Sequence, residues 1–344
     1  MTRDESLHAL QQLPKAELHL HLEGAIRPGT VVELARRHGD ALSIEEAAAR
    51  YQYSDFPGFL EAFKWVTSYL REPGDFELVA ERLVEELAGQ NVVYAEVIVA
   101  LGVMLWRGQQ PEPVFRALAR AADAGRKAGV RLAWAPDITR QFGPEAAMDV
   151  ARWAVRLKEF GVVAFGMGGD ELSVAAREFR AAFDYAAENG LRCTVHAGEV
   201  GGPEDIRQAM ELLHAERIGH GIAAMHDAEL RRTLARQDVP LEVCPVSNLR
   251  TGALAKQFGR PAKLDEHPLK LFFREGVPLT LSSDDPAMFH TTLAGEYDAG
   301  LAMGLDATEL ADIAQAAFSY AFISQAQREK YLAAFNRSRD DLGI

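Results

Sequence analysis

The feature that most constrains the fold of this chain is a repeated alternation of short apolar runs with longer amphipathic ones. Eight runs have the length and composition of buried strands: 16–22, 91–100, 130–138, 161–167, 191–198, 216–221, 239–245 and 277–285. Helical periodicity occupies most of the intervals, at 75–88, 113–128, 144–160, 173–189, 203–215 and 226–237. Strand and helix repeated in this way predict a parallel sheet covered by helices.

Two architectures use this alternation, a closed (β/α)8 TIM barrel and an open doubly wound sheet. The presence of eight units, with no glycine-rich phosphate loop after the first strand, favours the α/β barrel. No internal stretch rich in Pro or Ser divides the chain, so we expect one barrel domain over residues 1–344. The long interval after the first strand predicts a helical cap at about 28–90, over one end of the barrel. The tail at 306–340 is expected to be helical and to pack outside.

Composition restricts the class of partner. The formal net charge is −13, which disfavours nucleic acid and anionic membrane surfaces, since both attract clustered Lys and Arg. The chain has no apolar stretch of about 20 residues that could span a membrane, and its first residues lack the apolar core of a signal peptide. Its two cysteines, Cys193 and Cys244, lie far apart and indicate no disulfide framework. We therefore expect a cytoplasmic protein that acts on a small molecule.

Reactive side chains gather at the ends of the expected strands, where barrel enzymes carry their chemistry. The first strand contains His19 and His21, the fifth ends at His196, the sixth at His220, and the eighth at Asp284. Because side chains alternate along a strand, His19 and His21 point the same way and can hold one ion. The pattern predicts a metal site made of His19, His21, His196 and Asp284.

The donor set narrows the choice of metal. Three imidazoles and one carboxylate, without a thiolate, suit Zn²⁺ with one position left for water. Fe²⁺ and Mn²⁺ can be held by the same atoms. A second metal would need a bridging ligand from a middle strand, but the fourth strand ends in "FGMGGDE", with glycines at that point. We therefore predict one Zn²⁺ per chain.

Five short motifs occur in the order "HLHLEG", "GGDE", "HAGE", "GHG" and "SSDDP". Together they resemble the adenosine and adenine deaminases of the amidohydrolase superfamily, from about residue 14 to residue 290. The resemblance implies a metal-dependent barrel enzyme that replaces a purine 6-amino group with oxygen. It also implies the ligands named above, and these roles: Glu199 protonates ring N1, His220 orients the attacking hydroxide and assists its deprotonation, Asp285 contacts N7, and the Gly169 backbone donates to N3.

The chemistry of the residues agrees with these roles. Zinc lowers the pKa of water towards about 7, and a carboxyl whose pKa is raised by burial can protonate a ring nitrogen. Simpler interpretations exist for each residue: His220 as a loop histidine, Glu199 as a solvated carboxylate and Gly168–Gly169 as a tight turn. Asp170 and Glu171 are interpreted as caps of the following helix.

Departures from the adenosine-type pattern bear on the substrate. Where those enzymes have an Asp that binds the ribose 5′ hydroxyl, this chain has Glu23, as adenine deaminases do. Glu23 combined with "GGDE" resembles a third branch, which deaminates 5′-modified adenosines such as aminodeoxyfutalosine. We expect a 6-aminopurine nucleoside as substrate, with adenine as the alternative. A binuclear hydrolase of the phosphotriesterase or dihydroorotase type and a non-catalytic metal-binding relative stay as alternatives of other classes.

Overall fold

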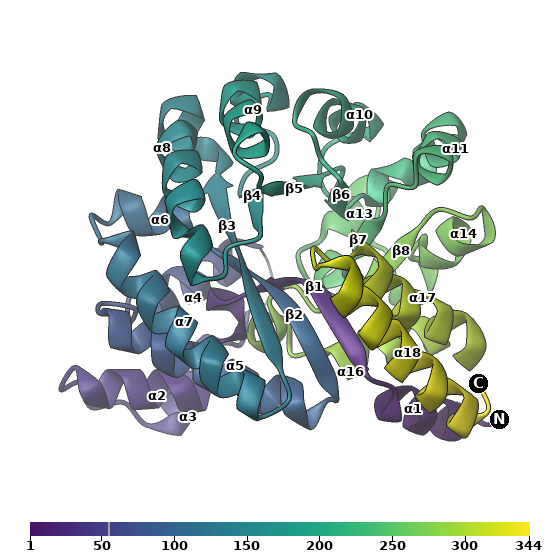
Figure 1. Ribbon diagram of the computed structural model, residues 1–344, viewed down its shortest axis with the longest axis horizontal. Helices are drawn as coiled ribbons and strands as arrows, with labels where there is room; N and C mark the ends of the chain where they lie inside the picture. Colours follow the sequence, from purple (N-terminus) through teal and green to yellow (C-terminus); the bar gives the residue numbers. More distant parts are fainter. Residues whose placement is uncertain (54–55) are drawn as a thin grey trace.

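The computed structural model describes residues 1–53 and 56–344, and in this part of the chain eight parallel strands pair in the order β1 to β8 (Figure 1). The strands are β1 Lys15–His21, β2 Val92–Val99, β3 Arg131–Thr139, β4 Ala164–Gly168, β5 Arg192–Ala197, β6 Arg217–His220, β7 Leu241–Val243 and β8 Leu279–Leu281. A parallel bridge between Leu20 and Asp284 joins the end of β8 to β1, and the His21 N–H donates to the Asp284 carbonyl at 2.9 Å. The predicted barrel is confirmed, and the open doubly wound sheet is excluded.

Helices surround the strands on the outside of the barrel (Figure 1). They are α1 Arg3–Gln12, α2 Pro28–Arg37, α3 Ile44–Arg50, α4 Phe56–Thr67, α5 Pro73–Gly89, α6 Leu101–Trp106, α7 Pro111–Lys127, α8 Gly143–Arg156, α9 Arg180–Glu188, α10 Pro203–Leu212, α11 Ala228–Gln237, α12 Pro245–Arg250, α13 Ala253–Phe258, α14 Leu269–Arg274, α15 Pro286–Phe289, α16 Leu293–Ala302, α17 Ala307–Tyr320 and α18 Gln325–Leu342. Across residues 1–53 and 56–344, none of them has the length and apolar character that crossing a bilayer requires.

The barrel is held by strands that are buried on both faces. In β3, residues Leu132 to Ile138 are all buried, which is why the sequence reads there as an almost continuous apolar run. Helices bury one stripe each: in α7, Val114, Leu118 and Ala121 recur at helical spacing and face the barrel. The tail is helical as predicted, and α17 packs directly on β8 and β1, so it belongs to the ring of barrel helices.

The segment after β1 has two parts. Helix α5 packs against α7 and β2, and is therefore the barrel helix that follows the first strand. Helix α4 instead packs on the 3₁₀ turn Glu23–Ala25 and on α15, beside the loops that leave β1 and β8. Aromatic contacts fix it there, with the Phe59 and Phe289 rings 5.1 Å apart. The cap predicted for 28–90 thus reduces to α2–α4, and its function as a cover stays a prediction.

Candidate functional site

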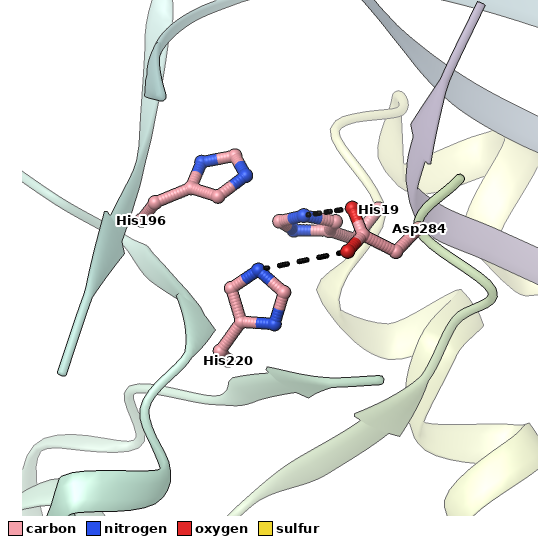
Figure 2. Close-up of side chains that lie close together, drawn as sticks. All are labelled: His19, His196, His220 and Asp284. Atoms are coloured by element: carbon pink, nitrogen blue, oxygen red, sulfur yellow. Dashed lines mark ion pairs between the residues drawn. The ribbon is translucent and has the colours of Figure 1, made fainter. Parts of the chain in front are cut away.

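Four imidazoles and one carboxylate meet at the end of the barrel where the strands terminate. His19 and His21 come from β1, His196 from β5 and His220 from the last position of β6, while Asp284 follows β8. The His19 ring lies 4.4 Å from the His196 ring and 4.9 Å from the His220 ring, between centroids. Figure 2 shows three of these rings turned toward one another and toward the Asp284 carboxylate. The fold brings these histidines together as predicted, although His19 and His220 are 201 positions apart in the sequence.

Two overlapping groups of side chains have the spacing needed to hold a metal ion. In the first, ligand atoms of His19, His196, His220 and Asp284 lie within 4.8 Å of one another, and in the second those of His21, Asp284 and Asp285 do. His21 also lies close to the first group, because its Nε2 is 3.3 Å from the His196 Nε2 and 3.3 Å from Asp284 Oδ1. The sequence-based ligand set is thus present in one cluster, which also contains His220.

The surroundings of two imidazoles fit a metal ion. The His19 Nδ1 is 2.9 Å from Glu242 Oε2, and the His196 Nδ1 is 2.8 Å from the Met167 carbonyl oxygen. Both partners are acceptors, so each Nδ1 carries the proton and each Nε2 directs a lone pair into the cluster. Among the residues that the structure describes, the buried His19 Nε2 makes no hydrogen bond, and it lies 3.4 Å from Asp284 Oδ1 in the ion pair drawn in Figure 2. A metal ion would satisfy it, and a carboxylate or carbonyl behind a ligating histidine is the usual arrangement.

A buried ion network supports His19 from behind, and sequence reasoning missed it. The Arg217 guanidinium donates to Glu242 Oε1 and to Glu96 Oε2, both at 2.5 Å, and all three side chains are at most 1% exposed. Burial raises the pKa of Glu242, but Arg217 and His19 outweigh it and lower that pKa to about 2. The signal available was a glutamate inside an apolar strand, "VPLEVCP", because a buried charge requires a partner.

Two residues of the cluster have unusual backbone conformations. His220 has φ 61° and Asp284 has φ 63°, in the left-handed region that residues other than glycine rarely adopt. Such conformations cost about 1–3 kcal/mol each and persist only where the surrounding structure imposes them. Both occur where a strand ends and its side chain turns into the cluster, which is consistent with a functional role for these positions.

Glu199 lies at the rim of the cluster, on the loop after β5. Its Oε2 is 3.7 Å from the His220 Nε2, and the Thr251 hydroxyl donates to its Oε1 at 3.4 Å. Burial, followed by the nearby charges of Asp284 and Glu171, raises the pKa of Glu199 to about 8. The carboxyl is therefore protonated at neutral pH and can act as an acid.

The predicted role of Glu171 as a helix cap is wrong. Its carboxylate accepts hydrogen bonds from the backbone N–H groups of 198–201, including Glu199 at 3.1 Å and Gly201 at 2.8 Å. No helix begins directly after Glu171 in the described chain; the next is the 3₁₀ segment Ala176–Phe179. Glu171 thus fixes the loop that carries Glu199, and the 27-residue separation from that loop hid the contact.

Three further carboxyls lie buried at this end of the barrel: Glu23, Asp137 and Asp285. Glu23 Oε1 accepts from the Ala100 N–H at 3.1 Å, but its Oε2, like Asp137 Oδ1 and Asp285 Oδ1, has no hydrogen-bond partner within the described chain. Burial raises the pKa of Glu23 to about 7 and raises those of Asp137 and Asp285 well above their ordinary values. Sequence reasoning missed Asp137, which sits on β3 inside an apolar run.

Glycines allow the close approaches in this region. A Cβ on Gly24 would lie 1.8 Å from Asp285 Oδ1, so only glycine fits beside that carboxyl. Gly169 has φ +92°, and a Cβ there would lie 2.4 Å from the Gln141 side-chain oxygen. The tight-turn interpretation of Gly169 explains its identity, and its backbone contact with a substrate stays a prediction.

An eight-stranded parallel barrel whose strand ends gather histidines and an aspartate defines the class of metal-dependent amidohydrolases. Within that class, the sequence pattern described as adenosine deaminase matches residues 14–336 of this chain. The chain therefore belongs to the adenosine deaminase family, as its motifs predicted, and is an enzyme of the deaminase type.

Three known proteins illustrate the similarity. An aminodeoxyfutalosine deaminase of Streptomyces coelicolor is 40% identical over 325 residues, which cover 92% of this chain and 82% of the relative. An adenine deaminase of Rhizobium meliloti is 35% identical over 326 residues, covering 94% and 98%. The crystal structure of an amidohydrolase from Burkholderia ambifaria with bound Zn superposes with a TM-score of 0.89 at 25% identity, covering 100% of this chain and 94% of that one.

Proposed function

We propose that this chain hydrolyses the 6-amino group of a purine nucleoside, adenosine or a 5′-modified adenosine such as aminodeoxyfutalosine, in a reaction that requires one Zn²⁺ per chain. The observation that carries the proposal is Glu199, a partly buried carboxyl with a pKa of about 8, placed 3.7 Å from His220 at the rim of a cluster that fits a metal ion. An acid poised near neutral pH beside such a cluster suits addition of water to a protonated heteroaromatic ring.

His19, His21, His196 and Asp284 are the residues that would hold the metal. Three imidazoles and a carboxylate without thiolate suit zinc, and the structural relative with bound Zn supports this choice. When bound, the metal ion supplies a nucleophile at neutral pH by lowering the pKa of water. Asp284 belongs to both candidate groups, so metal analysis of the purified enzyme must distinguish the proposed single ion from two.

The remaining residues act on the purine. Glu199 delivers its proton to N1, which makes C6 electrophilic, and His220 orients the nucleophile. Burial, followed by the nearby charge of Asp284, raises the pKa of Asp285 well above its ordinary value, which favours the protonated form that can donate to N7, an acceptor in adenine. The Gly169 backbone N–H contacts N3, and Glu23 faces the sugar, where its free Oε2 can accept from a hydroxyl.

The choice between nucleoside and free base depends on Glu23 and its neighbours. Glu23 and Asp137 each have a carboxyl oxygen without a hydrogen-bond partner in the described chain, in addition to the groups assigned to the adenine ring. These two acceptors support a substrate with additional hydroxyl groups. The relative from Streptomyces coelicolor supports a 5′-modified nucleoside, and the relative from Rhizobium meliloti supports adenine as the alternative.

The test is a comparison of adenosine, adenine and aminodeoxyfutalosine as substrates of the zinc-loaded enzyme, followed by loss of the adenine absorbance. A higher kcat/KM for either nucleoside supports the proposal, and a higher value for adenine supports the alternative. Metal analysis that finds two ions per chain, with no turnover of any of the three, would favour a binuclear hydrolase.

Two substitutions separate the acid from the metal ligands. Glu199→Gln should keep the metal and lose about 10²–10⁴-fold in kcat, the usual range for removal of a general acid. His19→Ala should lose both the metal and the activity, because it removes the imidazole that Glu242 holds in place as a ligand. Full activity of Glu199→Gln would contradict the assigned role. His214→Ala, at an exposed ion pair with Asp184, is the control.

A further inference from the structure

A chain of hydrogen bonds runs from the backbone of α14 to the catalytic cluster through two side chains that have no role so far. The Leu269 N–H donates to the His267 Nδ1 at 3.1 Å, the His267 Nε2 is 3.2 Å from Asn248 Oδ1, and the Asn248 Nδ2 is 3.1 Å from the His220 Nδ1. His267 is 4% exposed, and Asn248 and His220 are at most 1% exposed.

The backbone amide at one end fixes the direction of the whole chain. A peptide N–H can only donate, so the His267 Nδ1 must offer its lone pair. Burial lowers the pKa of His267 to about 3, which keeps this ring neutral, and its one proton is then on Nε2. That proton is donated to the Asn248 oxygen.

Asn248 transmits the direction to His220. With its oxygen accepting from His267, its amino group faces the His220 Nδ1 and donates to it. The His220 Nδ1 is therefore an acceptor, and in the neutral ring the proton resides on Nε2. This nitrogen faces the cluster, 3.7 Å from Glu199 Oε2 and 4.0 Å from Asp284 Oδ2.

His196 has the opposite arrangement. Its Nδ1 donates to the Met167 carbonyl oxygen at 2.8 Å, which leaves the Nε2 lone pair for the cluster. Two histidines whose rings lie 5.2 Å apart are thus prepared for different tasks by what lies behind them. His196 presents an acceptor that can bind a metal, and His220 presents an N–H.

We propose that Asn248 and His267 are positioning residues that hold the proton of His220 on Nε2, so that His220 acts as a hydrogen-bond donor in the site. This inference rests on the proposed function and refines it: an Nε2 that already carries a proton neither ligates the metal nor accepts a proton from water. Glu199 can take that proton once its own proton has passed to N1 of the purine, and the His220 N–H stabilises the negative charge that then forms beside it. Positioned N–H groups commonly supply such stabilisation in enzymes.

The direct test is the tautomer of His220 in the zinc-loaded wild-type enzyme labelled with [¹⁵N]histidine. Two-bond ¹⁵N–¹H correlation spectra distinguish Nε2–H, Nδ1–H and metal-bound rings, and His220→Gln and His267→Gln assign the signals. We expect the Nε2–H pattern for both His220 and His267. An Nδ1–H or metal-bound pattern for His220 overturns the inference. The spectrum needs no substrate, so the tautomer of His220 can be tested even if the proposed purine substrate is wrong.

Asn248→Asp reverses the direction of the hydrogen bond between residue 248 and His220. A carboxylate accepts from both neighbours, so His220 should move its proton to Nδ1, and kcat should fall about 10²-fold while KM changes less than about threefold. Asn336→Asp, the same substitution on the exposed side of α18, is the matched control. A fall in kcat with the Nε2–H pattern of His220 unchanged would show a merely structural role and overturn the inference.

Substitution of His267 supplies a rescue. In His267→Gln the side-chain oxygen can accept from Leu269 and the amino group can donate to Asn248, which preserves the direction. We expect this variant to retain kcat within about fivefold, whereas His267→Leu, which removes both contacts, should lose about tenfold or more. Equal losses in the two variants would contradict positioning by hydrogen-bond direction.

Discussion

Two sets of buried carboxyls in this barrel differ in what surrounds them. Behind His19, Glu96 and Glu242 share the Arg217 guanidinium, and the pKa of Glu242 is held at about 2. At the mouth, Glu23, Asp137 and Asp285 form no ion pair with Lys or Arg among the described residues, although the charge of Arg107 acts on Glu23 from a distance. Burial raises their pKa values, and each has an oxygen without a hydrogen-bond partner in the described chain. We name them the supporting set and the facing set.

The difference separates structure from recognition. In the supporting set each charge is compensated inside the protein, so its contacts stabilise the fold and hold His19 for a metal. In the facing set no ion pair compensates the carboxyls, and a buried polar atom without a hydrogen-bond partner costs about 1–3 kcal/mol. A folded chain keeps such atoms where a ligand completes them, which supports placing the substrate against Glu23, Asp137 and Asp285.

The largest expected effect breaks the supporting set. Arg217→Met leaves two buried carboxylates without their cation, so the free energy of unfolding should fall by about 3–5 kcal/mol, measured by urea unfolding. Arg192→Met is the matched control: Arg192 also lies over the Phe322 ring, but its partner Glu216 is exposed. Arg192→Met should lower the free energy of unfolding by less than about 1 kcal/mol. Similar losses for both variants would contradict the distinction between the two sets.

A substitution in the facing set should have the opposite sign. The pKa of Glu23 is about 7 in the fold and 4.5 as its ordinary value, so the folded state holds the proton more tightly. The contribution of protonated Glu23 to the free energy of unfolding is fully present below pH 4.5 and is lost as the pH rises through 7. Glu23→Gln cannot ionise, so it should be more stable than the wild type by about 2–3 kcal/mol at pH 8 and by less than about 1 kcal/mol at pH 5.

Urea midpoints at the two pH values check this prediction. Loss of stability in Glu23→Gln at pH 8 would mean that Glu23 is ionised and compensated, like the supporting set. Activity measurements supply an independent test. If Glu23 binds a sugar hydroxyl, Glu23→Gln should raise KM for nucleosides and leave KM for adenine unchanged.

Much of the barrel and of the cluster followed from the sequence, because the signals were local. An apolar run followed by His196 or Asp284 predicts a buried strand and also the end of it that carries reactive side chains. His19 and His21 share a face because side chains alternate along a strand. The long first interval also showed an addition to the barrel, although only the structure separates α5 from α2–α4.

What escaped prediction depends on partners that are distant in the chain. Glu242 pairs with Arg217 on the neighbouring strand, and Glu171 binds the backbone of the 198–201 loop. His267 belongs to none of the sequence motifs, and only its contact with Asn248 links it to the site. Periodicity tells which face a residue occupies, but it does not tell which side chain of another strand meets it there.

The smallest expected effect concerns the titration of Glu199. With a pKa of about 8 the carboxyl is protonated below that value, so kcat/KM should be constant below pH 8 and fall about tenfold per unit above it. The hydrogen bond from Thr251 lowers this pKa, so Thr251→Val should move the fall to higher pH by less than about one unit. Thr233→Val, at an exposed hydroxyl that contacts Arg236, should leave the profile unchanged. A wild-type kcat/KM that rises with pH instead of falling above pH 8 would mean that Glu199 is ionised in its active form, and Glu199 would then belong with the compensated carboxylates of the supporting set.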